Sequence, residues 1–218
     1  MIYERVAADA PIEQGDLFRC VPSLEISLSE LPRVDGSGEQ LTRWRDIAAG
    51  LSESSERVRV LVEVEPVLAI AVTQNCDAAR KGSICLCQVE RYLDVAGQQS
   101  EPKDAKAWQS LIVRMMRTNP RLFYLPPAPE FGLAERMAAD FSIIQRIPRA
   151  DLEEMRSGFR VARLKPVAAE HLRESLAFFF RRYAFNEWYP LDREEFLAYQ
   201  ASCREPVAPY EWQRPPAT

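Results

Sequence analysis

Residues 65–77 read Glu65-Pro66-Val67-Leu68-Ala69-Ile70-Ala71-Val72-Thr73-Gln74-Asn75-Cys76-Asp77, an apolar run that ends in polar and reactive side chains. A strand that is buried on both faces has this nearly continuous apolar character. The run therefore predicts a central strand over 67–72. The rigid end of such a strand can hold a thiol and a carboxylate in fixed positions, so we place the candidate chemistry at Thr73, Gln74, Cys76 and Asp77.

Further segments with strand or helix patterns surround this run. Apolar alternation and turn residues indicate short strands, and apolar residues at helical spacing indicate two helices. The predicted strands lie at 17–21, 57–64, 83–92, 121–125, 139–144 and 159–164, and the helices at 105–116 and 168–183. The polar stretch 29–55 is predicted to be an insertion with one helical turn at 41–49. The sequence thus predicts a small, mostly antiparallel β unit.

The composition is that of an ordinary globular protein. Of the 218 residues, 47% are hydrophobic and 28% are charged, which excludes extensive disorder. The net charge of −4 argues against a protein that binds mainly duplex nucleic acid. Five cysteines, an odd number, and the start Met1-Ile2-Tyr3-Glu4-Arg5 predict a cytoplasmic protein. No window is apolar enough for a membrane span.

Two short motifs carry a resemblance to a known family. The stretches Gln14-Gly15-Asp16-Leu17-Phe18 and Glu65-Pro66-Val67-Leu68-Ala69-Ile70 resemble the PemK/MazF-like toxins, whose first strand begins with Gly-Asp and whose central strand begins with Arg-Pro. The resemblance implies a small SH3-like barrel that dimerises, and in many members the cleavage of single-stranded RNA. Glu65 stands where that family has an arginine, and a glutamate cannot stabilise charge on a transferring phosphoryl group.

We therefore expect an α+β fold: a small SH3-like antiparallel β-barrel with an inserted helix and a C-terminal helical segment. The expected barrel domain is 1–165, with the inserted loop 29–55 and the helix 105–116. The C-terminal helical segment is expected at 166–205 and an extended tail at 206–218.

Cys76 has two functional interpretations besides a structural one. As a nucleophile it would need a base, and the only histidine is His171 in the C-terminal helix. As a metal ligand it would join Cys85 and Cys87, with Asp77 or Cys20 as the fourth ligand, although the Cys-x-Cys spacing is unusual for zinc. The pattern favours strand cysteines that pack as small hydrophobes, and we expect no cofactor.

The basic residues of the C-terminal third, with aromatic residues among them, also have two interpretations. They could line a path for single-stranded nucleic acid, or they could be solvated partners of nearby acids, which the pattern favours. The residues concerned are Arg160, Arg163, Lys165, Arg173, Arg181 and Arg182, with Phe178, Phe180, Tyr183 and Trp188. The run 178–180 of three phenylalanines covers most of a helix circumference and predicts burial against a second surface.

The leading hypothesis is a non-catalytic interaction or scaffold protein of a bacterial toxin–antitoxin or phage-defence type of system, with a protein partner or a homodimer. One alternative is a single-strand-specific endoribonuclease with Thr73, Gln74 and Asp77 at its site and Arg19 or Arg80 on the phosphate, which makes RNA the other partner considered. The second alternative is a cysteine- or zinc-dependent enzyme centred on Cys76.

Overall fold

The computed structural model describes residues 1–24, 26–35, 38–50 and 58–181, together with Glu194, Leu197 and Ala201. The chain divides into two compact units, Met1–Leu176 and Ala177–Thr218, so the division falls within helix α6 (Pro166–Arg181). The expected tail 206–218, Cys203 and most of 182–205 lie outside the described residues. The following account concerns the first unit.

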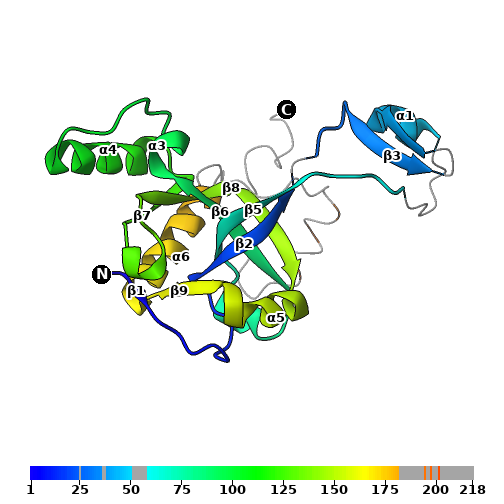
Figure 1. The fold of residues 1–218 in the computed structure, drawn as a ribbon. Coiled ribbons are helices and arrows are strands. Elements are labelled where there is room, and N and C mark those ends of the chain that lie inside the picture. Colours follow the sequence, from blue (N-terminus) through cyan, green and yellow to red (C-terminus); the bar gives the residue numbers. More distant parts are fainter. Residues whose placement is uncertain are drawn as a thin grey trace. The chain divides into compact units, whose positions relative to one another are not determined.

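An antiparallel sheet of seven strands forms the centre of the described part (Figure 1). Its strand order is β1-β9-β2-β5-β6-β8-β7. In that order the strands are β1 (Tyr3–Glu4), β9 (Arg160–Leu164), β2 (Asp16–Leu24), β5 (Val64–Ala71), β6 (Ser83–Arg91), β8 (Met137–Pro148) and β7 (Leu122–Leu125). The predicted central strand is therefore confirmed as β5, which lies at the middle of the sheet. The predicted strand 57–64 differs, because β5 begins only at Val64.

The expected SH3-like barrel is wrong, because the sheet stays open in the described part. The two edge strands, β1 and β7, pair only with β9 and β8 and not with each other. A small barrel buries its apolar residues in its own interior. Here helices cover both faces of the sheet instead, which gives the apolar residues of both faces a partner without closure.

Helix α5 (Arg149–Phe159) and the short helix α2 (Asn75–Ala78) cover part of one face. Residues opposite each other in an antiparallel pair share a face, and the pairs Phe18–Ala69 and Ala71–Leu86 place these side chains together. They form a buried cluster with Leu152 of α5. This is the principal contact of α5, since Leu152 is its buried residue.

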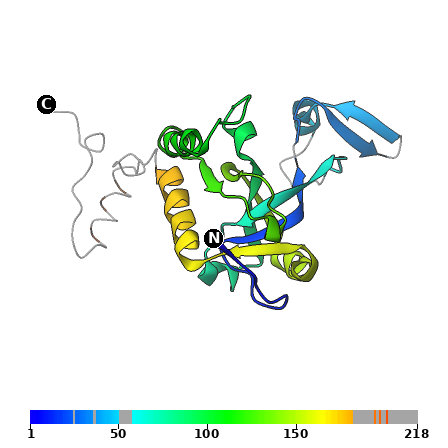
Figure 2. The ribbon, with the colours of Figure 1, turned by 60° about the vertical axis from the view of Figure 1, so that its left-hand side comes forward.

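Helix α6 covers the opposite face with its residues up to Leu176. Leu17, Ile70 and Cys87 alternate with the first cluster along their strands and are fully buried. Ala168 and Leu172 are the buried residues of α6. Figures 1 and 2 show this part of α6 against the side of the sheet opposite α5.

Helices α3 (Tyr92–Val95) and α4 (Ala105–Thr118) pack at the β7 end of the sheet, where Tyr92, Trp108, Leu111 and Leu122 form a second cluster. Asp104 caps α4, because its carboxylate accepts a hydrogen bond from the Ala107 amide at 2.8 Å. The predicted helix 105–116 is thereby confirmed. None of the described helices has both the length and the apolar character needed to cross a membrane.

The predicted insertion contains a separate two-stranded ribbon and a helix. Strands β3 (Leu31–Asp35) and β4 (Gly38–Thr42) pair with each other, and α1 (Trp44–Ala49) follows. The amide of Trp44 donates to the Leu28 carbonyl at 2.9 Å, and that of Leu61 to the Pro32 carbonyl at 2.8 Å. The helical turn predicted at 41–49 is confirmed as α1.

Candidate functional site

The polar residues that follow β5 form a turn that is hydrogen-bonded to neighbouring segments. The Thr73 hydroxyl accepts a hydrogen bond from the Cys85 amide at 2.7 Å, and the Asn75 side chain accepts one from the Gln14 amide at 2.8 Å. These contacts tie the turn to β6 and to the loop before β2. The hydroxyl of Thr73 is therefore engaged in holding the fold.

Cys76 and Asp77 lie in the short helix α2, next to Lys81. The Cys76 thiol is exposed and donates a long hydrogen bond, 4.0 Å, to the Gln74 side-chain oxygen. Asp77 accepts from Lys81 Nζ at 2.9 Å, and both side chains face solvent. His171 lies in α6 and makes no hydrogen bond to Cys76, so the described residues do not form the Cys76–His171 pair that the nucleophile hypothesis needs.

The two arginines that were candidates for phosphate binding, Arg19 and Arg80, lie in different segments, β2 and the turn after α2. Arg19 donates to the Gly158 carbonyl at 3.0 Å, and Arg80 is exposed after α2. Cys85 and Cys87 share one side of β6, whereas Cys76 lies in α2 and Cys20 is exposed in β2. Within the described residues, no group of three or more His, Cys, Asp or Glu side chains could hold a metal ion.

The described thiols differ strongly in their surroundings, and we expect their reactivities to differ accordingly. Burial, followed by the nearby Asp140, raises the pKa of the Cys87 thiol to about 12. With a thiol reagent at neutral pH, Cys20 and Cys76 should be modified quickly and Cys87 only after unfolding in urea, because the thiolate is the reactive form. Peptide mass spectrometry reads out each site. Rapid modification of Cys87 in the folded protein would contradict its placement in β6.

The raised pKa of Cys87 also predicts a loss of stability in alkali. The unfolded thiol releases its proton near pH 9.0 and the folded one near pH 12. The contribution is present below pH 9.0 and is lost as the pH rises toward 12, because the unfolded state then binds fewer protons. Urea unfolding along this pH series should show a falling free energy of unfolding, with a shallower fall in Cys87→Ala. Equal slopes in the two proteins would show that another group carries the effect.

The Gly-Asp motif forms a buried ionic network. The Asp16 carboxylate is fully buried and lies 3.1 Å from Arg160 and 2.6 Å from Arg163. Arg160 also donates to the carbonyls of Ala7 and Ala10, at 2.6 and 3.1 Å. The network holds the loop 7–14 onto β2 and β9, so the motif has a structural role here.

Gln14 extends these contacts to α2 and α6. Its side-chain nitrogen donates to the Val72 carbonyl at 2.8 Å, and its oxygen accepts from Arg173 Nε at 3.1 Å. Arg173 also pairs with Glu170 on its own helix. Arg173 thus has the acidic partner that the sequence suggested, whereas Arg160 is buried and belongs neither to a solvated face nor to a nucleic-acid path.

The aromatic residues of 178–180 belong to the second unit. Phe178 and Phe180 are exposed, and Phe179 contacts Phe180 with ring centroids 5.1 Å apart. Arg182, Tyr183 and Trp188, which belong to the same basic and aromatic series, lie outside the described residues. The burial of this run against a second surface therefore stays a prediction.

A polar strip interrupts the apolar face of the sheet between the α5 cluster and the α4 cluster. Strand pairing and alternation place five side chains on this face, and the strip consists of Ser23, Gln88, Glu90, Asp140 and Gln145. The Ser23 hydroxyl donates to Gln88 at 2.9 Å. The buried Asp140 accepts from the Ser142 hydroxyl at 2.6 Å. A buried polar group is a stronger indication of a structural or functional role than an exposed one. No sequence pattern indicated this strip.

The strip contains two carboxylates, Glu90 and Asp140, and one arginine, Arg121, lies beside them. Burial, followed by the negative charge of Asp140, raises the pKa of Glu90, while Arg121 opposes the shift. Arg121 lies 3.6 Å from Asp140 as its ionic partner. Arg121 Nε and Gln145 Nε2 are buried without a hydrogen-bond acceptor among the described residues. Raised carboxyl pKa values occur at functional sites and also in structural ion clusters.

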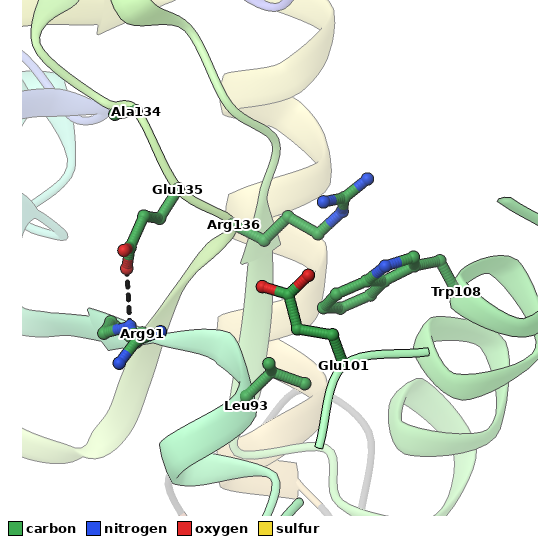
Figure 3. Close-up of a pocket in the computed structure, with 7 residues that line it drawn as sticks. All are labelled: Arg91, Leu93, Glu101, Trp108, Ala134, Glu135 and Arg136. Carbon is green, nitrogen blue, oxygen red and sulfur yellow. Dashed lines mark ion pairs between the residues drawn. The ribbon is translucent and has the colours of Figure 1, made fainter. Parts of the chain in front are cut away.

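A small cavity opens between β6, the loop before β8 and α4 (Figure 3). Its volume is about 120 Å³. Seven residues line it: Arg91, Leu93, Glu101, Trp108, Ala134, Glu135 and Arg136. Trp108 lies in the helix predicted at 105–116, but no sequence pattern indicated that charged residues from three separate segments would meet beside it.

Charged groups surround the Trp108 ring in this cavity. The Arg136 guanidinium lies over the ring, 4.2 Å from its centroid, and its positive charge opposes the burial that raises the pKa of Tyr124. Arg91 and Glu135 form an ion pair at 2.5 Å on the rim. Glu101 has no ion pair or hydrogen bond among the described residues, and Figure 3 shows its carboxylate directed toward the space beside Trp108.

Exposed apolar side chains concentrate in the described residues of 24–64, which we call the arm. Eight of the 18 large hydrophobic side chains that are exposed in the described part belong to it. These eight are Leu24, Ile26, Leu28, Leu41, Trp44, Leu61, Val62 and Val64. Leu24 and Val64 are directly opposite each other at the ends of β2 and β5. Single exposed hydrophobic residues are normal, but a concentration of them indicates an interaction surface.

The arm also contains a hollow of about 410 Å³, lined by Leu28, Ser29, Arg43, Trp44 and Arg45. Arg45 pairs with Asp46 at 3.4 Å. Arg43 has no ion pair with the described residues, and its guanidinium lies beside the apolar wall. A hollow of this kind can receive an apolar side chain together with a carboxylate.

Comparison with known proteins adds no family. No protein-family model and no curated protein matches the chain.

Proposed function

We propose that this protein is a non-catalytic interaction protein that binds a protein partner through the arm. The observation that carries the proposal is the concentration of exposed apolar side chains over 24–64. Interfaces are centred on such residues, and tryptophan is among the side chains that contribute most to binding. Trp44, partly exposed in the hollow, is positioned to be such a residue.

The hollow defines the chemistry of the partner. A leucine or phenylalanine side chain would fill its apolar part, and an adjacent carboxylate would pair with the Arg43 guanidinium. We therefore propose a partner segment that combines an apolar side chain with an acidic neighbour. A cytoplasmic location belongs to the same proposal and rests on the free thiols of Cys20, Cys76, Cys85 and Cys87.

The toxin–antitoxin or phage-defence setting has less support. It rests on the two short motifs, because the sheet lacks the closed barrel of that family. The buried Asp16 network gives the first motif a structural explanation. The enzyme alternatives have less support among the described residues, because Cys76 is not hydrogen-bonded to His171 and Arg19 donates to the Gly158 carbonyl. Protein binding is thus the function with a described surface behind it.

Paired capture experiments test this function. Tagged wild type and Leu28→Asp are used to capture partners from the native host, and each protein lost with the variant is purified and titrated against the full chain. We expect direct binding that Leu28→Asp and Trp44→Ala weaken by at least about tenfold, as substitutions at central interface residues do. Val113→Asp on α4, an exposed valine outside the arm, is the matched control and should bind like wild type.

Two results would overturn the proposal. One is a captured protein that binds wild type and Leu28→Asp with equal affinity, because the arm would then be irrelevant to it. The other is a dimer of the wild type that dissociates in Leu28→Asp, seen by light scattering, because a second copy of this chain would then occupy the arm.

A further inference from the structure

We propose that the cavity beside Trp108 binds a small zwitterion, an α-amino acid of the size of glycine or alanine, between Glu101 and Arg136. The proposal is independent of the arm and of protein binding. It rests on the arrangement of charges in Figure 3, where a free carboxylate and a guanidinium without an acidic partner line one small space.

The two ends of the site have opposite and available charges. No described carboxylate forms an ion pair with Arg136, whose guanidinium lies over the Trp108 ring. Its planar N–H groups can therefore donate to a ligand carboxylate. Glu101 likewise has no cationic partner among the described residues and can accept from a ligand ammonium.

The rim and the floor restrict what can enter. Arg91 pairs with Glu135 at 2.5 Å and also lies 3.9 Å from Asp94, so its charge is compensated within the protein. Trp108 is 7% exposed and Leu93 is 9% exposed, and both belong to one buried cluster, so the floor is apolar. A volume of about 120 Å³ has room for a molecule of a few heavy atoms but not for a nucleotide. A small zwitterion satisfies the size and both charges, whereas a simple anion or cation satisfies only one.

The tryptophan ring provides a direct readout. The chain has four tryptophans, so protein labelled with 5-fluorotryptophan gives few ¹⁹F signals, and Trp108→Phe assigns the relevant one. Glycine and L-alanine are the probes. Propionate and ethylamine are L-alanine without its ammonium or without its carboxylate, and each should bind at least about tenfold more weakly because one charge-assisted contact is missing.

Glu101→Gln should weaken L-alanine binding by at least about tenfold, since it removes the charge that pairs with the ammonium. Glu154→Gln, an exposed glutamate on α5, is the matched control and should leave binding unchanged. The proposal is overturned if the Trp108 signal shows no saturable shift, which is the result expected if Glu101 and Arg136 simply pair with each other in solution. It is also overturned if propionate binds as well as L-alanine, because the site would then recognise only an anion.

Discussion

Replacing Asp16 by asparagine should lower the free energy of unfolding by about 3–5 kcal/mol, the range expected when one partner of a buried ion pair is removed. The reason is the burial of the groups that would remain. The Arg160 side chain is only 3% exposed, and its other acceptors in the described part are backbone carbonyls of the loop 7–11. Arg163 keeps Glu13 at 3.1 Å, so Arg160 is the charge left without a counterion. Urea unfolding at neutral pH measures the loss from the shift in midpoint at constant m.

The same chemical change at Asp77 is the matched control. Asp77 pairs with Lys81 at 2.9 Å, but both side chains are substantially exposed. Exposed ion pairs contribute about 0–1 kcal/mol, so Asp77→Asn should unfold close to wild type. Equal effects of the two substitutions would mean that Asp16 is hydrated in solution and that the buried network does not stabilise the fold.

This contrast also bears on the family resemblance. The Gly-Asp motif drew attention as a family signature, yet its physical role in this chain is local. Gly15 has φ of +93°, a backbone conformation that favours glycine, and it brings its neighbour Asp16 under the arginines of β9. A turn that needs glycine followed by a buried acid can thus arise without a barrel. The motif alone therefore did not determine the topology.

Strands and helices with a clear apolar period could be predicted from the sequence. The run 67–72 became the central strand β5, and the spacing over 105–116 became α4. Closure of the sheet could not be predicted, because it depends on whether the edge strands meet. β1 has two residues and β7 has four, and neither carries a pattern that names its neighbour. Helices cover both faces of the sheet, so its apolar residues are buried without closure into a barrel.

Of the candidate sites, likewise, one could be predicted from the sequence and another could not. The turn 73–77 could be found in the sequence, since reactive residues directly follow an apolar run, but its hydrogen bonds serve the fold. The cavity beside Trp108 could not be found, because Arg91, Glu101 and Arg136 come from segments that only the tertiary structure brings together. The arm was indicated as an insertion, while the exposure of its apolar residues depends on which of them find a partner.

Leu152→Ala is expected to destabilise the protein by about 2–5 kcal/mol, the range for a buried leucine whose loss leaves a cavity. Leu152 is fully buried and is the residue through which α5 contacts Phe18, Ala71 and Leu86. The same substitution at Leu28, which is 60% exposed in the arm, should change stability by no more than about 0.5 kcal/mol. Urea unfolding of the two variants compares identical chemical changes at a core and a surface site.

Leu28→Ala should weaken partner binding without loss of stability, and Leu152→Ala should lower stability without weakening binding, which distinguishes a binding surface from an unpacked one. Leu28→Ala should weaken a partner that occupies the arm while the fold stays intact, because it removes apolar area from the hollow. Leu152→Ala should leave the affinity of the remaining folded protein unchanged, since α5 lies outside the arm. If Leu28→Ala instead destabilises the protein as much as Leu152→Ala, the arm is packed against the rest of the chain in solution and is unavailable to a partner.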